Sequence, residues 1–181
     1  MNNKAIFLDR DGVINKDHAY IYKIEDFEFI HGVFDACRHF KQLGYRIIIV
    51  TNQSGIGRGY YSEHEFAVLT EWMKSQFMAN DCEIDAVYFC PHHPEKAVAP
   101  YRLECECRKP APGMLLKGIE AFDLLPSACV MIGDKPSDMA AAQAAGIGRK
   151  ILLRSEQLLN PDKTTDADEL WQSLACGLDR F

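Results

Sequence analysis

The sequence predicts an α/β fold in which a parallel sheet is covered by helices on both faces. Three observations support this prediction. Short apolar runs alternate along the chain with helix-like stretches. The length of 181 residues suits one compact domain. Hydrophobic residues make up 48% and charged residues 25%, which excludes a disordered or fibrous chain. We therefore expect a single Rossmann-like domain spanning residues 1–181.

Five apolar runs predict the buried strands of this sheet, because each is rich in β-branched or aromatic residues. They lie at residues 5–8, 46–50, 86–89, 129–132 and 150–153. In an open parallel sheet, ligands bind at the carboxyl ends of the strands. The residues that directly follow these runs are therefore the first candidates for a functional site.

Helices are expected between the strands. Residues 32–43 carry an apolar stripe that stops at a glycine. Residues 62–65 form a capping box, which opens an amphipathic helix. The alanine-rich residues 136–145 end at another glycine. A last helix is expected near residues 168–174.

Two irregular stretches, residues 15–29 and 91–112, interrupt this alternation. No second block of strand-forming sequence lies before the second strand, or between it and the third. We therefore expect no large cap domain. Only short inserts, including residues 15–29, residues 55–61 and a loop at about residues 90–107, would cover the site.

The net charge, the N-terminal sequence and the cysteines indicate which binding partners and which cellular compartment to expect. The net charge is −6 without a block of like charges, which argues against a nucleic-acid surface. The first apolar run is too short for a secretory signal or a membrane span. Seven cysteines suit a compartment in which thiols stay reduced. We expect a cytoplasmic monomer that binds neither nucleic acid nor membrane.

Two carboxylates follow the first predicted strand, in the segment Asp9-Arg10-Asp11-Gly12. An ordinary turn rich in aspartate and glycine is the structural alternative. Their position at the carboxyl end of a strand, with one residue between them, lets both face one pocket. Such an aspartate can attack phosphorus, and its neighbour can pass a proton to the leaving oxygen.

Anion-binding groups follow the second strand and precede the fourth. The run Thr51-Asn52-Gln53-Ser54-Gly55 offers hydroxyl, amide and backbone donors, although a plain polar loop is the alternative. Arg108 and Lys109 supply cations that could neutralise phosphoryl oxygens.

Two further carboxylates follow the fourth strand. Asp134 stands at its carboxyl end, where Mg²⁺ would need another oxygen ligand. Asp138 lies one turn into the next predicted helix, and capping is the role we favour for it.

These four segments, in this order, resemble the haloacid dehalogenase superfamily of phosphotransferases over nearly the whole chain. The resemblance implies that Asp9 is a nucleophile forming an aspartyl phosphate and that Asp11 is the general acid/base. It implies that Thr51 and Lys109 hold the phosphoryl group. It also implies Mg²⁺ bound by the Asp9 carboxylate, the Asp11 backbone carbonyl and Asp134.

A second constellation lies in the loop at residues 90–107. Cys90, His92, Cys105 and Cys107 supply three sulfurs and one imidazole, a complete tetrahedral set for Zn²⁺. His93 is a competing ligand, and a loop with incidental thiols is the alternative. A closed site of this kind is structural, and it would hold in place the two cations that follow Cys107.

The combined motifs F-L-D-R-D-G, T-N-Q-S-G, C-P-H-H-P, C-x-C-R-K-P and G-D-K resemble the heptose bisphosphate phosphatase family, which acts in lipopolysaccharide precursor synthesis. That resemblance implies a small sugar bisphosphate as substrate. The substrate contacts it implies are Asp17, His18, Tyr20, Asn52, Gln53, Ser54, Arg108 and Lys135. The alternatives are a histidinol-phosphate phosphatase, another small phosphosugar phosphatase, or a non-catalytic module that binds zinc and phosphate. The acidic balance argues against a polynucleotide phosphatase.

Overall fold

A computed structural model describes residues 3–153 and 166–181 of the chain. Within these residues six strands form one sheet in the order β3-β2-β1-β4-β5-β6, and all neighbouring strands run parallel. The strands are β1 (Ala5–Leu8), β2 (Arg46–Asn52), β3 (Ala86–Cys90), β4 (Val130–Gly133), β5 (Arg149–Leu153) and β6 (Glu169–Trp171). The predicted parallel α/β sheet is confirmed.

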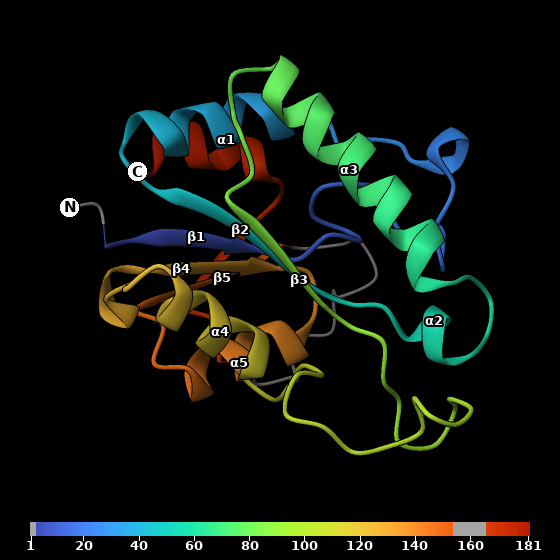
Figure 1. Cartoon of the computed structure of the whole chain (residues 1–181). Coiled ribbons are helices and arrows are strands. Elements are labelled where there is room, and N and C mark those ends of the chain that lie inside the picture. Colours follow the sequence, from blue (N-terminus) through green and yellow to red (C-terminus); the bar gives the residue numbers. More distant parts are fainter. Residues whose placement is uncertain (1–2, 154–165) are drawn as a thin grey trace.

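Helices cover both faces of this sheet. The α-helices are α1 (Val33–Gln42), α2 (Ser54–Gly57), α3 (Glu63–Ala79), α4 (Gly113–Ala121) and α5 (Pro136–Ala144). Short 3₁₀ helices span Ile24–Asp26, Pro126–Ala128 and Leu174–Asp179. Helices α1 and α3 lie on one face, and α4 and α5 lie on the other (Figure 1). None of the helices in the described ranges is both long and apolar enough to cross a bilayer.

The alternation of side chains along β1 divides the core between the two faces. Ile6 and Leu8 pack with buried residues of α1 and α3. Ala5 and Phe7 pack on the opposite face, with residues of α4 and α5. Because β1 is buried on both faces, its sequence reads as a continuous apolar run, as expected for a central parallel strand.

The strand order places the carboxyl ends of β2, β1 and β4 side by side. The chain adds β2 and β3 on one side of β1, and then returns to place β4 on the other side. This reversal creates a crevice at the carboxyl ends, the usual ligand position in such folds. Only short helical turns at Ile24–Asp26 and Ser54–Gly57 precede the covering helices in the connections after β1 and β2. No large cap domain therefore interrupts the described chain.

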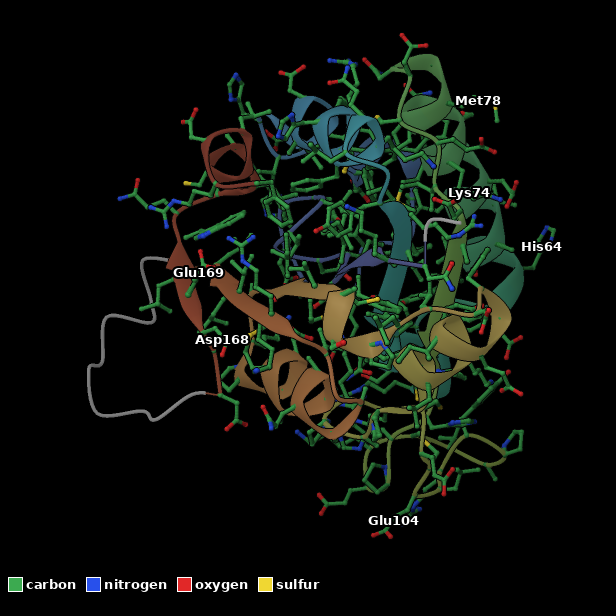
Figure 2. All side chains as sticks on the ribbon, turned by 90° about the vertical axis from the view of Figure 1, so that its left-hand side faces the viewer. His64, Lys74, Met78, Glu104, Asp168 and Glu169 are labelled. Carbon is green, nitrogen blue, oxygen red and sulfur yellow. The ribbon has the colours of Figure 1, made fainter. Side chains whose placement is uncertain are left out.

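The prediction of a helix near residues 168–174 is wrong. The chain forms strand β6 there, and the 3₁₀ helix begins only at Leu174. Asp168 and Glu169 lie at this edge of the sheet, beside β5 (Figure 2). The backbone N–H of Lys150 donates to the Asp168 carboxylate at 2.7 Å, and Arg149 pairs with Glu169 at 2.6 Å. These contacts reach across about 20 residues of sequence, so local periodicity could not reveal them.

Candidate active site and metal centres

The centre of the site is a buried ion cluster around Lys109. Its Nζ lies 3.0 Å from Oδ1 of Asp9 and 2.6 Å from Oδ1 of Asp138, and it donates to the backbone carbonyl of Val50 at 2.8 Å. Burial acts to lower the pKa of Lys109, but the charges of Asp138 and Asp9 outweigh it and raise that pKa. The ammonium therefore stays charged next to the proposed nucleophile.

Asp9, Asp134 and Asp138 bring carboxylate oxygens within 4.8 Å of one another. Burial raises the pKa of Asp9 to about 6, and burial together with the charge of Asp9 raises the pKa of Asp134 to about 7. Oδ1 of Asp134 is buried without a hydrogen-bond donor among the described residues. Crowded, buried carboxylates are the environment that a hard divalent cation such as Mg²⁺ stabilises. The residues present fit this ion.

Asp138 has a different role within this cluster. Its Oδ2 accepts the backbone N–H of Lys135 at 3.0 Å, the capping contact expected from the sequence. Its other oxygen pairs with Lys109. With both oxygens engaged, Asp138 serves as the counter-ion of Lys109, and Asp9 and Asp134 are the better metal ligands.

Gly12 allows the turn after β1 to approach Asp134. Its φ is +86°, and a Cβ placed there would lie 2.2 Å from Oδ2 of Asp134. Any other residue would be strained by its backbone angle and would clash with the carboxylate. The glycine of the D-x-D-G segment thus brings the turn from β1 against the residue that follows β4.

Both oxygens of the Asp11 carboxylate accept hydrogen bonds. Oδ1 accepts from Arg10 Nη2 at 2.9 Å and from Asn15 Nδ2 at 3.0 Å, and Oδ2 accepts from Gln53 Nε2 at 3.0 Å. Burial acts to raise the pKa of Asp11, but the charge and hydrogen bonds of Arg10, with those from Asn15 and Gln53, hold it below its usual range. The ionised form is therefore favoured while no phosphate is nearby.

A pocket of about 250 Å³ opens at Asp11. Six of the predicted substrate contacts line it: Asp17, Tyr20, Asn52, Gln53, Ser54 and Lys135. Lys135 Nζ lies 3.4 Å from Asp17, so the two form a charged pair at the rim. His18 lies instead near Glu28, at 3.8 Å, with 60% of its side chain exposed.

Thr51, Asn52 and Arg108 have structural contacts near the site. Thr51 Oγ1 accepts from Gln53 Nε2 at 2.8 Å. The amide of Asn52 exchanges two hydrogen bonds with the backbone of Lys109, each 3.1 Å long, which fixes the chain that delivers the lysine. Arg108 donates to the backbone carbonyl of His92 at 3.3 Å. The loop of residues 91–112 is thus tied to the carboxyl end of β2.

Cys90, His92, Cys105 and Cys107 also bring their ligand atoms within 4.8 Å of one another. The three sulfur–sulfur distances are 2.9, 3.4 and 3.5 Å. All exceed the roughly 2.05 Å of a disulfide, and two approach the roughly 3.8 Å between sulfurs around a tetrahedral zinc ion. His93 lies outside this cluster, since its Nδ1 accepts the backbone N–H groups of Glu95 and Lys96. The donor set fits Zn²⁺.

Sequence reasoning missed four polar residues around the two aspartates. Arg10, Asn15 and Tyr61 are buried beside Asp11 or Gln53, and Asp138 was expected only to cap a helix. Arg10 lies within the D-x-D-G segment and Asn15 three residues after it, so their closeness to the two aspartates in the sequence was the available signal. The partner of Tyr61 lies eight residues away across a turn, and that of Asp138 lies in a different loop, so no helix or strand period links either pair.

Comparison with known proteins identifies the family of the chain. A sequence model of the haloacid dehalogenase-like hydrolases matches residues 3–146. The chain belongs to this family of hydrolases, and the predicted superfamily is confirmed. Among its relatives, the D-glycero-beta-D-manno-heptose-1,7-bisphosphate 7-phosphatase of Escherichia coli K12 is 48% identical over 171 residues, covering 94% of this chain and 90% of the relative. The Vibrio cholerae enzyme of the same name is 50% identical over 155 residues, covering 86% of this chain and 83% of the relative.

A solved structure has the same fold. The crystal structure of D,D-heptose 1,7-bisphosphate phosphatase from B. bronchiseptica, complexed with magnesium and phosphate, superposes with a TM-score of 0.86. The two sequences are 26% identical, and the superposition covers 98% of this chain and 97% of the other.

Proposed function

We propose that this chain hydrolyses the 7-phosphate of D-glycero-β-D-manno-heptose 1,7-bisphosphate, in the synthesis of the ADP-heptose used for the lipopolysaccharide core. The observation that carries this proposal is the 48% identity to a phosphatase of that name, which extends over 94% of the chain. The cation of Lys135 at the rim of an open pocket suits a substrate with a second phosphate.

The chemistry follows from the two aspartates. An oxygen of Asp9 attacks phosphorus and forms an aspartyl phosphate, while Asp11 protonates the leaving sugar oxygen. The negative charge of the arriving phosphate raises the pKa of Asp11 and favours the protonated form that this step needs. Asp11 then takes a proton from the water that attacks the aspartyl phosphate. Inorganic phosphate leaves, and the Asp9 carboxylate is restored.

Two cations offset the repulsion between an anionic nucleophile and an anionic phosphate. Lys109, 3.0 Å from Asp9, is the cation that the protein itself provides. Mg²⁺ held by the Asp9 carboxylate, the Asp11 backbone carbonyl and Asp134 would supply further charge neutralisation and orient the phosphoryl group. A relative of the same fold crystallised with magnesium and phosphate supports this metal.

Zn²⁺ is the proposed ligand of Cys90, His92, Cys105 and Cys107. Four protein ligands leave no coordination site for water, so this ion would stabilise a loop and take no part in hydrolysis. That loop carries Arg108 and Lys109 immediately after Cys107. The zinc ion would therefore support the active site by fixing the position of Lys109.

Phosphate release from a panel of substrates tests the proposal. The panel holds both anomers of heptose 1,7-bisphosphate, fructose 1,6-bisphosphate and histidinol phosphate, each with and without Mg²⁺, and Asp9→Asn is the inactive control. We expect the β anomer to give the highest kcat/KM. A preference for histidinol phosphate would replace the proposed substrate, and no Mg²⁺-dependent release from any of them would overturn a phosphatase function.

A further inference from the structure

The orientation of Asp11 depends on the amide of Gln53. Nε2 of Gln53 donates to Asp11 Oδ2 at 3.0 Å and to Thr51 Oγ1 at 2.8 Å, so both of its amide hydrogens are used. A glutamine amide has two ends of similar shape and opposite polarity. If the amide turned over, its oxygen would face the Asp11 carboxylate and repel it. Once protonated, however, Asp11 could donate to that oxygen, so a second group is needed to hold the amide in its orientation during proton transfer.

Tyr61 is that group. Its hydroxyl donates to Oε1 of Gln53, whereas Asp11 is bonded by the nitrogen of the same amide. Burial raises the pKa of Tyr61 to about 12, so the phenol keeps its proton and remains a donor. By donating to Oε1, the phenol stabilises the orientation in which the N–H groups point toward Asp11 and Thr51.

The ring of Tyr61 is held in place by its neighbours. The residue is 5% exposed, and its ring stacks on Tyr22 with centroids 5.2 Å apart and an interplanar angle of 7°. A Cβ at Gly55 would lie 2.2 Å from the Tyr61 ring, so only a glycine leaves room for it. The hydroxyl is thus presented to Gln53 from a fixed position.

We propose that Tyr61 is a positioning residue for the reaction: acting through Gln53, it holds the Asp11 carboxylate in the orientation that transfers a proton to the leaving oxygen. This inference rests on the proposed function, in which Asp11 is the general acid. It also assigns Gln53, expected from the sequence to contact substrate, to the support of Asp11.

The test uses leaving groups that differ in their need for a proton. A sugar alkoxide needs a general acid to leave, whereas p-nitrophenolate leaves without one. The kcat/KM value reports on the steps up to formation of the aspartyl phosphate.

For Tyr61→Phe, which keeps the ring and removes the hydroxyl, we expect kcat/KM on heptose bisphosphate to fall roughly tenfold, a fraction of the whole general-acid contribution. On p-nitrophenyl phosphate it should change less than about twofold. Tyr88→Phe makes the same change at a half-buried tyrosine of β3 and should change neither value.

A double-mutant cycle shows whether the effect passes through Gln53. Gln53→Leu should show the same selective loss on the sugar substrate, and adding Tyr61→Phe to it should cause no further loss. Additive losses, or equal losses on both substrates, would overturn the positioning role.

Asp11→Asn separates this inference from the proposed mechanism. It should show the largest selective loss on the sugar phosphate. If Asp11→Asn discriminates between the substrates and Tyr61→Phe does not, only the role of Tyr61 fails. If Asp11→Asn does not discriminate, the general-acid assignment fails and the positioning role fails with it.

Discussion

Among the residues that the structure describes, two clusters carry metal-ligating side chains, and they are built in opposite ways. Asp9 and Asp134 directly follow β1 and β4, two neighbouring strands buried on both faces. Three of the four ligands of the second cluster lie in the loop of residues 91–112, which consists of turns and bends without a helix or strand. Glu104, in the same loop, projects at the periphery of the molecule (Figure 2).

Because of this difference, we expect the metal at the carboxylates to matter for catalysis and the metal at the thiols to matter for folding of the loop. The sheet positions the carboxylates whether or not a metal is bound, so removing that metal should leave the fold intact. The loop has little regular hydrogen bonding of its own, and binding energy at its thiols would be coupled to its folding. Lys109 connects the two clusters, because it follows Cys107 by two residues and contacts Asp9.

The largest expected effect is the loss of turnover in Asp9→Asn. Removing the nucleophile should lower kcat by several orders of magnitude. Thermal stability should stay close to that of the unaltered protein, because the sheet still holds the site and the amide removes one charge from the crowded carboxylates. Phosphate release and thermal denaturation measure the two effects. Retention of more than about a tenth of the turnover would exclude a covalent role for Asp9.

The next effect concerns the counter-ion of Lys109. Asp138→Asn replaces a fully buried charge and leaves the ammonium with Asp9 alone. Removing one partner of a buried ion pair costs roughly 3 kcal/mol, so both stability and kcat should fall. Asp123→Asn makes the same chemical change at an exposed site and serves as the control. Chemical denaturation measures the free energy of unfolding, and equal values for the two variants would contradict the role given to Asp138.

Features with a local cause could be predicted from the sequence. The strands follow from apolar runs, and helix α3 follows from the capping box at its start, in which Ser62 and Glu65 exchange hydrogen bonds. Asp9 and Asp134 could be found because the ends of parallel strands meet at one edge.

Features without a regular local pattern, and contacts between different elements, were not predicted. Tyr61 reaches Gln53 and Asp138 reaches Lys109 only in the folded chain. Strand β6 has three residues, too few to show a period, and α2 and α4 were not among the expected helices. The family resemblance implied that His18 contacts substrate, but its side chain lies beside Glu28.

Removing a thiol from the zinc cluster should have a smaller effect, mainly on thermal stability. Purified protein should hold about one zinc ion per chain, and Cys107→Ala should lose it, with a fall in Tm of roughly 5–10 °C. KM should rise and kcat should fall, because Lys109 would lose its fixed approach to Asp9. Cys176→Ala removes a half-buried thiol outside the cluster and is the matched control. Metal analysis, thermal denaturation and kinetics on both variants test this, and a zinc-free Cys107→Ala protein with unchanged stability and activity would show that the thiols are incidental.

The smallest expected effect is the pH dependence of protein stability that arises from the carboxylate cluster. The ordinary pKa of aspartate is 3.8, whereas the pKa values of Asp9 and Asp134 are raised to about 6 and about 7 by burial. Between pH 4 and pH 7 these two carboxyls therefore hold more protons in the folded protein than in the unfolded chain, so their contribution should lower the stability of the magnesium-free protein as the pH rises. Mg²⁺ binds ionised carboxylates, and at low pH it must first displace these protons.

Excess Mg²⁺ should accordingly raise the Tm by a few degrees at about pH 8 and by much less at about pH 5. Dialysis rather than a chelator should be used to prepare the magnesium-free protein, so that ions at the thiols are retained. Asp134→Asn removes one of the two responsible carboxylates, so in this variant the Mg²⁺ effect should disappear and the decline in stability with pH should become shallower. An equal Mg²⁺ shift at both pH values in the unaltered protein would mean that the ion binds away from Asp9 and Asp134, and the contrast between a preformed carboxylate site and a loop shaped by its metal would no longer hold.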